Sequence, residues 1–277
     1  GHSGVVVTNN DPAALSDGHI ICTPAQLESE FKGAVDLIKY LVGVLGLQDD
    51  VSYRFSRWDP KNPDKYVGTA EDWNRVETAM QTILSDLGIE HTEAWGEAAF
   101  YGPKLDVQGK NVHGKEDTLF TVQIDFALAT RFDMIYIDEN GEKARPIIIH
   151  RSSIGCYERT LAMLIEKYNG AFPMWLAPEQ VRVLSLTDRT CDVAKSVRNK
   201  LFDMGLRAEV DVRSEKLGKK IREAQIEKVP YILVIGDKEA EQNVVAVRHR
   251  TDGDLGAMSV DDFAKLALIE VATKQIK

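Results

Sequence analysis

Cysteine is scarce in this chain of 277 residues, and long apolar runs are missing from it. The three cysteines, Cys22, Cys156 and Cys191, are odd in number and scattered, which argues against a disulfide framework or a four-thiolate zinc site. No stretch approaches the roughly 20 consecutive apolar residues of a membrane-spanning helix. The N-terminus also lacks the basic and apolar segments of a signal peptide. We therefore expect a soluble, globular, cytoplasmic protein without a membrane partner.

The common sequence signatures of nucleotide loops and of one large hydrolase class are also missing. The chain contains no G-x-x-x-x-G-K-[ST] and no G-x-G-x-x-G, so neither of the two usual phosphate-binding loops is indicated. It contains no G-x-S-x-G, which argues against a serine nucleophile on a strand-to-helix turn. The two commonest kinds of nucleotide-binding loop therefore lack support in this sequence.

The net charge of −9 argues against a general nucleic-acid coat, but the charge is unevenly distributed. Residues 1–180 hold 16 basic against 27 acidic side chains, whereas residues 181–250 hold 15 basic against 11 acidic ones. A basic segment inside an acidic chain could face phosphates. A solvated surface of mixed charge is the alternative, and charge alone does not separate the two.

The first part of the chain predicts helices around an antiparallel sheet. Thr23 and Pro24 suit the start of a helix, and apolar residues continue at helical spacing to about residue 46. Short apolar or alternating runs separated by glycine turns then predict strands without alternating helices, which is typical of antiparallel sheets. The expected elements are a strand at 51–57, a helix at 70–87, strands at 105–107, 119–126, 133–136 and 147–149, and a helix at 154–168.

The second part has a different rhythm, in which strands and helices alternate. Residues 169–178 are rich in glycine and proline, as at a domain junction. Alternation predicts a three-layer α/β domain with a largely parallel sheet. The expected strands are 181–186, 207–212, 231–235 and 244–249, and the expected helices are 191–204, 217–228 and 260–274.

The segment from His150 to Arg159 is the most informative polar cluster. The pattern predicts a strand at 147–149 with His150 at its C-terminal end. It also predicts that a helix begins a few residues later. A helix N-terminus attracts anions, Gly155 would permit close approach of a ligand, and Arg159 could bind a phosphate or stack on a base. Alternatively, His150 is a core histidine and Arg159 pairs with a neighbouring glutamate.

Several motifs in one order give the chain a family resemblance. It resembles the later part of threonyl-tRNA synthetases, a family of class II aminoacyl-tRNA synthetases. The motifs that carry the resemblance are HIICT at 19–23, GEAAFYGPK at 96–104, TVQIDF at 121–126, HRSSIGCYER at 150–159, WLAP at 175–178, EKLG at 215–218, KIRE at 220–223, VPY at 229–231, GDKE at 236–239 and DLG at 254–256.

The resemblance implies a class II catalytic domain over residues 5–176, without its N-terminal portion, and an anticodon-binding domain over 179–277. It also implies a zinc ion held by one cysteine and two histidines, together with ATP and Mg²⁺. Matched position by position, His19 and His150 are the zinc ligands, Asp17, Tyr101 and Gln123 bind threonine, Lys104, Gln123 and Arg159 are catalytic, Arg159 and Gly155 bind ATP, and Arg222, Glu239 and Arg248 contact the anticodon.

The chain also departs from the family pattern. Class II motif 1, most of motif 2 and the zinc cysteine have no counterpart, and no arginine precedes Arg54 to serve as the motif 2 arginine. Leu15 and Ser16 replace a glutamine and an aspartate, Thr118 replaces a glutamine, and Ser214 replaces an asparagine. Without the thiolate and the arginine, we expect this chain alone to be a poor catalyst.

The function implied by the resemblance is that of a threonine–tRNA ligase, which joins threonine to its tRNA through a threonyl-adenylate. Its partners would be threonine, ATP, the acceptor end and anticodon of threonine tRNA, and a second copy of the chain in a homodimer. The alternative is a non-catalytic tRNA-binding or regulatory paralogue. In the anticodon region, a salt-bridge network of Glu215, Arg222 and Glu223 remains a purely structural interpretation.

Overall fold

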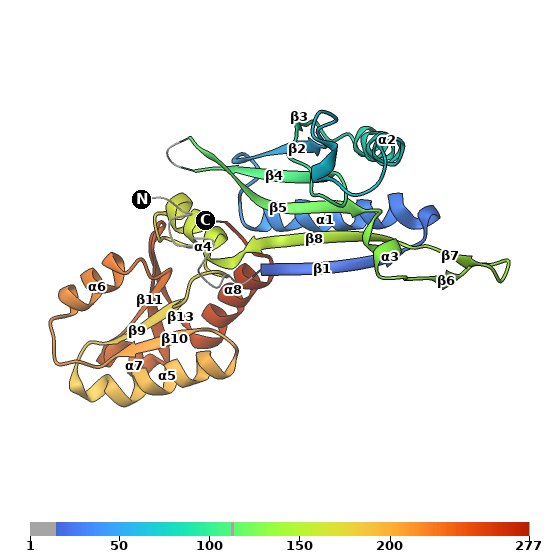
Figure 1. Cartoon of the computed structure of the whole chain (residues 1–277). Helices are drawn as coiled ribbons and strands as arrows, with labels where there is room; N and C mark the ends of the chain where they lie inside the picture. The colour runs from blue at the N-terminus through green and yellow to red at the C-terminus, as the bar shows by residue number, and fades with distance from the viewer. Residues whose placement is uncertain (1–14, 112–113, 277) are drawn as a thin grey trace. The chain divides into compact units, whose positions relative to one another are not determined.

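The computed structural model describes residues 15–111 and 114–276, which form two compact units (Figure 1). The first unit extends to Glu166 and the second begins at Lys167. The expected start of the first domain, at residue 5, lies outside the described residues. Within the described part of the chain, every helix is too short or too polar to cross a membrane.

The first unit is built on a six-stranded sheet with the order β1-β8-β5-β4-β2-β3. All neighbouring strands are antiparallel except the pair β2 and β3, so the expected antiparallel sheet with flanking helices is confirmed. The elements are β1 (Leu15–Cys22), α1 (Leu27–Val44), β2 (Val51–Arg57), α2 (Ala70–Asp86), β3 (Thr92–Trp95), β4 (Lys104–Lys110), β5 (Glu116–Asp125), α3 (Leu128–Arg131), β6 (Tyr136–Ile137), β7 (Lys143–Ala144), β8 (Ile147–Cys156) and α4 (Tyr157–Tyr168).

Two strands of this sheet escape detection in the sequence. β1 is an edge strand that lies beside β8, and it carries polar residues at several positions, so it lacks an apolar run. β3 has four residues and pairs with β2 in parallel. The prediction of a strand at 133–136 is wrong. β6 begins only at Tyr136, and it forms a two-stranded hairpin with β7.

The strand predicted at 147–149 is much longer than expected, which changes the position of His150. β8 continues through Cys156, and α4 begins at Tyr157, so His150 lies in the middle of a strand and not at its end. Gly155 has a φ of +70°, and a Cβ atom there would lie 1.9 Å from the backbone oxygen of Leu119. The missing side chain therefore admits the neighbouring backbone of β5, not a ligand as the sequence suggested.

Helix α1 covers one face of the sheet, where it contacts β8, β5 and β1 (Figure 1). Its buried side chains include Phe31, Val35 and Ile38. The strands present apolar residues such as Ile124 and Ile149 to the interior. Because side chains alternate between the two faces of a strand, the residues next to them along the chain lie on the opposite face.

The second unit has a five-stranded sheet with the order β10-β9-β11-β12-β13. β10, β9 and β11 are parallel, but β12 and β13 are antiparallel additions, so the sheet is less parallel than expected. The sequence pattern did not predict the strand Gly253–Ser259 or the helix Asp237–Gln242. The elements are β9 (Val181–Ser185), α5 (Cys191–Asp203), β10 (Ala208–Asp211), α6 (Leu217–Ile226), β11 (Tyr231–Ile235), α7 (Asp237–Gln242), β12 (Val244–His249), β13 (Gly253–Ser259) and α8 (Val260–Ala272).

The expected three layers of this unit are confirmed. Leu201 of α5 and Phe263 of α8 share one buried apolar cluster with the strands. Ala224 of α6 packs into a second cluster with Leu184 of β9. Because successive residues of β9 belong to different clusters, helices cover both faces of the sheet.

Candidate functional site

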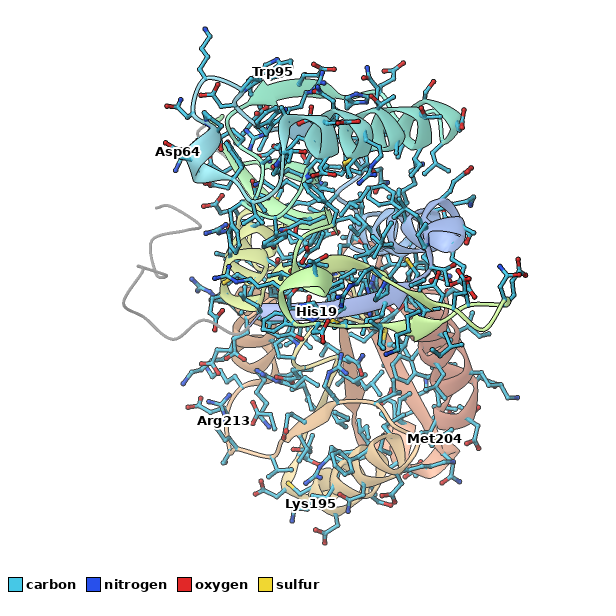
Figure 2. The ribbon with its side chains drawn as sticks, turned by 45° about the vertical axis from the view of Figure 1, so that its right-hand side comes forward. His19, Asp64, Trp95, Lys195, Met204 and Arg213 are labelled. Carbon is cyan, nitrogen blue, oxygen red and sulfur yellow. The ribbon has the colours of Figure 1, made fainter. Side chains whose placement is uncertain are left out.

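Four neighbouring strands align four of the predicted site residues in one row across the first sheet. His19 of β1 lies opposite His150 of β8, which lies opposite Gln123 of β5, which in turn lies opposite Lys104 of β4. Figure 2 labels His19 within the first unit. Residues directly opposite each other in a sheet share a face. The register therefore brings together four residues that the sequence separates by up to 131 positions, as counted from His19 to His150.

A second polar row lies two residues further along the same strands and hence on the same face. It pairs Asp17 with Ser152, Ser152 with Thr121, and Thr121 with Asp106. Asp17 is exposed, whereas Asp106 is fully buried. One face of the sheet thus carries polar groups from four strands, while α1 covers the apolar face.

His150 is held from several sides. Its Nε2 lies 2.8 Å from Oδ2 of Asp125, the side chain of which is fully buried. The ring of Tyr101 stacks on the imidazole, with ring centroids 4.8 Å apart and planes inclined by 25°. The ring of His19 meets it edge-on, with a centroid distance of 4.5 Å. The imidazole is therefore fixed in place by contacts from three other strands or loops.

Tyr101 joins this group to Gln123 through its hydroxyl, which donates a hydrogen bond to the side-chain oxygen of Gln123. Burial, together with the negative charges of Asp125 and Asp17, raises the pKa of Tyr101 to about 12. The phenol therefore remains protonated at neutral pH and keeps its role as a donor.

Lys104 belongs to a small charged cluster on β2 and β4. Its Nζ lies 3.2 Å from Oδ2 of Asp106. The same oxygen accepts a 2.6 Å hydrogen bond from the hydroxyl of Ser56, and Nη2 of Arg54 lies 3.5 Å away. No motif in the sequence predicted a role for Asp106. Its position two residues after Lys104 was the available signal, because that spacing places both side chains on one face of a strand.

Arg159 lies in the first turn of α4, directly after Glu158. Its Nη1 donates a 3.0 Å hydrogen bond to the backbone oxygen of Thr118 on β5. This contact fastens the guanidinium to the sheet. The residue is only partly buried, so the remaining guanidinium donors can face a bound anion.

The fit of a zinc ion is tested by the donor atoms on this face. Within residues 15–111 and 114–276, no three His, Cys, Asp or Glu side chains are placed to hold a metal. His19 and His150 are adjacent imidazoles, which suit zinc. A histidine that binds zinc usually donates its other ring N–H to a carboxylate, as His150 can to Asp125. The described residues therefore fit two ligands of a zinc site and lack the third.

The predicted anticodon residues lie on three elements of the second unit. Arg222 is exposed on α6, and Arg248 on β12 lies 3.9 Å from Asp254. Glu239 accepts a 2.9 Å hydrogen bond from the backbone N–H of Gly236 and so caps the start of α7. The suggested salt-bridge network of Glu215, Arg222 and Glu223 is wrong about the arginine. Glu223 pairs with Arg213, at 2.5 Å, and not with Arg222.

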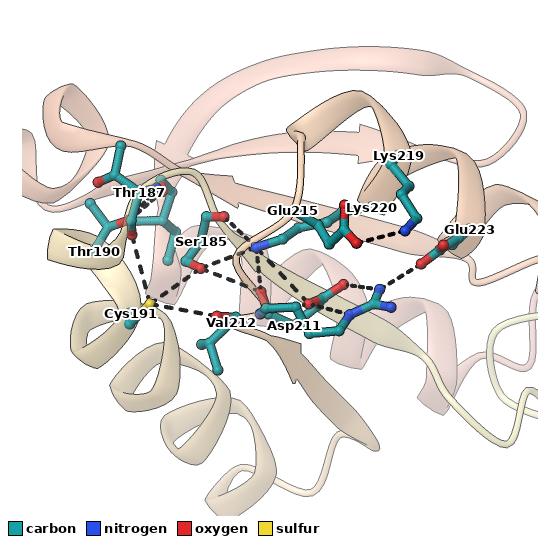
Figure 3. Close-up of polar contacts among 12 residues, drawn as sticks. Ser185, Thr187, Thr190, Cys191, Asp211, Val212, Glu215, Lys219, Lys220 and Glu223 are labelled. Carbon is teal, nitrogen blue, oxygen red and sulfur yellow. Dashed lines mark hydrogen bonds and ion pairs between the residues drawn. The ribbon is translucent and has the colours of Figure 1, made fainter.

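The sequence pattern gave no sign of a buried lysine, Lys220, which contacts Ser185 and Asp211 in the second unit (Figure 3). Lys220 is 2% exposed, and its ammonium donates to the backbone oxygens of Ser185 and Asp211 at 3.0 and 3.3 Å. It thereby joins the carboxyl ends of β9 and β10. A hollow of about 250 Å³ opens beside it and is lined by Thr187 and Ser214.

Comparison with protein families matches both units of the chain. Residues 14–168 match the core domain of class II tRNA synthetases for Gly, His, Pro, Ser and Thr. Residues 180–268 match an anticodon binding domain. The two matches follow the same order as the two sheets.

Individual relatives agree with these matches. The chain is 62% identical over 261 residues to a threonine–tRNA ligase of Clostridium botulinum, and 59% identical over 261 residues to one of Clostridium perfringens. Each alignment covers 94% of this chain and 41% of the relative, so the chain spans about two fifths of their length.

A solved structure gives the same result. The RNA binding domain of threonyl-tRNA synthetase from Cryptosporidium parvum superimposes with a TM-score of 0.85 at 32% sequence identity. The superposition covers 96% of this chain and 64% of that one. The chain therefore belongs to the class II aminoacyl-tRNA synthetase family, with a class II core followed by an anticodon-binding domain, and it is similar to threonine–tRNA ligases.

Proposed function

We propose that this chain is the part of a threonine–tRNA ligase that carries the amino-acid face of the active site and the anticodon-binding domain. The observation that carries the proposal is the cross-strand row of His19, His150, Gln123 and Lys104 on the open face of an antiparallel sheet. In the proposed reaction the threonine carboxylate attacks the α-phosphorus of ATP and releases pyrophosphate. The threonyl group then passes to a ribose hydroxyl of its tRNA.

The side chains of the polar face suit the binding of threonine. Asp17 can accept hydrogen bonds from the ammonium group of threonine. The hydrogen bond between Tyr101 and Gln123 holds both of these polar side chains in place. Rigid donors and acceptors bind a reacting group without having to reorganise. A site that pairs with the threonine hydroxyl would reject valine, because valine would leave that site's polar groups unsatisfied.

The cations of the site suit the phosphates of ATP, which would enter with Mg²⁺. Lys104 and Arg159 carry the positive charge, and Arg159 is fastened to the sheet through Thr118. Charge that develops on the α-phosphate and on the leaving pyrophosphate would be stabilised by these groups. Gly155 can contact ATP only through its backbone, because the backbone oxygen of Leu119 fills the position where a side chain would lie.

Zinc is part of the proposal, with His19 and His150 as two of its ligands. When bound, the ion would supply a Lewis-acidic centre for the amino and hydroxyl groups of threonine. The third ligand would come from a part of the protein outside the described residues. We further propose that Arg222, Glu239 and Arg248 contact unstacked anticodon bases, since arginine and carboxylate side chains suit base edges.

The test is threonine-dependent exchange of pyrophosphate into ATP by the longer gene product that contains this chain. We expect exchange by the native protein, and a loss of at least about tenfold in Arg159→Ala, as for removal of one charge-stabilising donor. Binding of threonine tRNA should fall in Arg222→Ala, while exchange persists. Absence of exchange with retained tRNA binding would favour the non-catalytic paralogue. Sedimentation of the same product tests the proposed homodimer.

A further inference from the structure

Asp125 is a fully buried carboxylate with a fixed orientation at the end of β5. Its Oδ1 accepts two backbone hydrogen bonds, from the N–H of Ala127 at 2.9 Å and from that of Leu128 at 2.8 Å. These bonds lie in the turn that leads into α3. Because both donors belong to the backbone, the carboxylate cannot rotate without breaking this turn, and Oδ2 is left for another partner.

The partner of Oδ2 is Nε2 of His150, at 2.8 Å. A carboxylate oxygen with no proton can only accept, so Nε2 must carry the hydrogen of this bond. In a neutral imidazole the lone pair then lies on Nδ1. Among the residues that the structure describes, Nδ1 has no hydrogen-bond partner, and the stacked ring of Tyr101 holds the plane of the imidazole.

We propose that Asp125 is a positioning residue that makes His150 present Nδ1 to the bound metal. This inference rests on the proposed function, because that function requires a zinc ligand at His150. The chemistry matches the second ring nitrogen of zinc-bound histidines, which is commonly held by a carboxylate. Neither the family resemblance nor the residue motifs assigned Asp125 this role.

The first test uses the metal-free chain of 277 residues and therefore does not depend on enzymatic activity. Two-bond ¹⁵N–¹H correlation spectra distinguish which ring nitrogen of His150 is protonated. We expect the Nε2–H form in the native chain. In Asp125→Asn, the amide oxygen should keep the two backbone donors and the NH₂ group should face Nε2, so His150 should change to the Nδ1–H form. The same form in both proteins would overturn the proposal.

The second test is the affinity for Zn²⁺ in the longer gene product, measured by competition with a chromophoric chelator. We expect Asp125→Asn to bind Zn²⁺ about 10- to 100-fold more weakly. The matched control is Asp117→Asn on the same strand, which pairs with exposed Lys115 at 3.4 Å and should bind Zn²⁺ normally. Thermal melting curves show whether each variant is folded.

The outcomes separate the inference from the proposed function. If the native product binds no Zn²⁺, the zinc part of the proposed function fails. The proposed metal role of Asp125 then also fails, even if Asp125→Asn changes the tautomer of His150. If Zn²⁺ binds equally well to the native protein and to Asp125→Asn, only the role of Asp125 is overturned. Weaker binding together with the change of tautomer supports both.

Discussion

Nζ of Lys104 lies 3.2 Å from Oδ2 of Asp106, and the Asp106 side chain has no exposed surface. Arg54 approaches the same oxygen at 3.5 Å, and Ser56 donates to it at 2.6 Å. A buried charge is tolerated only where it is paired. Asp106 is therefore the counter-charge that lets two cations lie on the polar face of the sheet.

Replacing Asp106 by asparagine should destabilise the first unit. The change leaves Lys104 and Arg54 without their shared counter-charge, and we expect a loss of about 2 kcal/mol in the free energy of unfolding, less than for a fully buried pair because both cations are partly exposed. Urea denaturation of the 277-residue chain measures it. The surface pair of Lys115 and Asp117 is the control, and Asp117→Asn should cost under about 1 kcal/mol. Equal losses in the two variants would contradict this view of Asp106.

Replacing Lys220 by methionine should destabilise the second unit. The backbone oxygens of Ser185 and Asp211 would lose a buried donor, and we expect a cost of roughly 3 kcal/mol. Lys219 is the matched control, because it lies directly before Lys220 in the same helix but pairs with Glu215 at the surface. Lys219→Met should change stability by less than about 1 kcal/mol. Chemical denaturation followed by circular dichroism compares the two variants.

Replacing Gly155 by alanine should be far more costly than a positive φ alone explains. The new Cβ would lie 1.9 Å from the backbone oxygen of Leu119, so β5 and β8 would have to separate. Gly141 is the control, since its φ is +79° and, its two chain neighbours aside, no atom of the described residues lies within 4 Å of its Cβ position. We expect about 1 kcal/mol for Gly141→Ala and at least about 3 kcal/mol for Gly155→Ala, from thermal unfolding. Similar costs would show that the strands can adjust.

The titration of Tyr101 should reveal its burial. Its pKa is raised to about 12, from the ordinary value near 10. A group with a raised pKa in the folded state contributes stability that is complete below pH 10 and is lost as the pH rises toward 12. The difference in absorbance at 295 nm between the native chain and Tyr101→Phe should therefore change near pH 12. A midpoint near pH 10 would mean that the hydroxyl is open to solvent.

Local patterns in the sequence predicted much of the architecture. The helix after Thr23 and Pro24, the helix at 70–87 and the alternating second domain were predicted because helix starts, apolar periodicity and turn residues act over a few neighbouring positions. The site residues His19, His150, Gln123 and Lys104 were predicted from motifs, and their convergence on one row came with the strand register.

Other features depend on pairing between distant segments. β1 forms because β8 offers it an edge, and β8 extends to Cys156 because it pairs with both β1 and β5. Asp106, Asp125 and Lys220 look like ordinary polar residues until their burial and partners are known. Short-range patterns record the preferences of the backbone, whereas the partner of a buried charge is set by the register and packing of strands far apart in the chain.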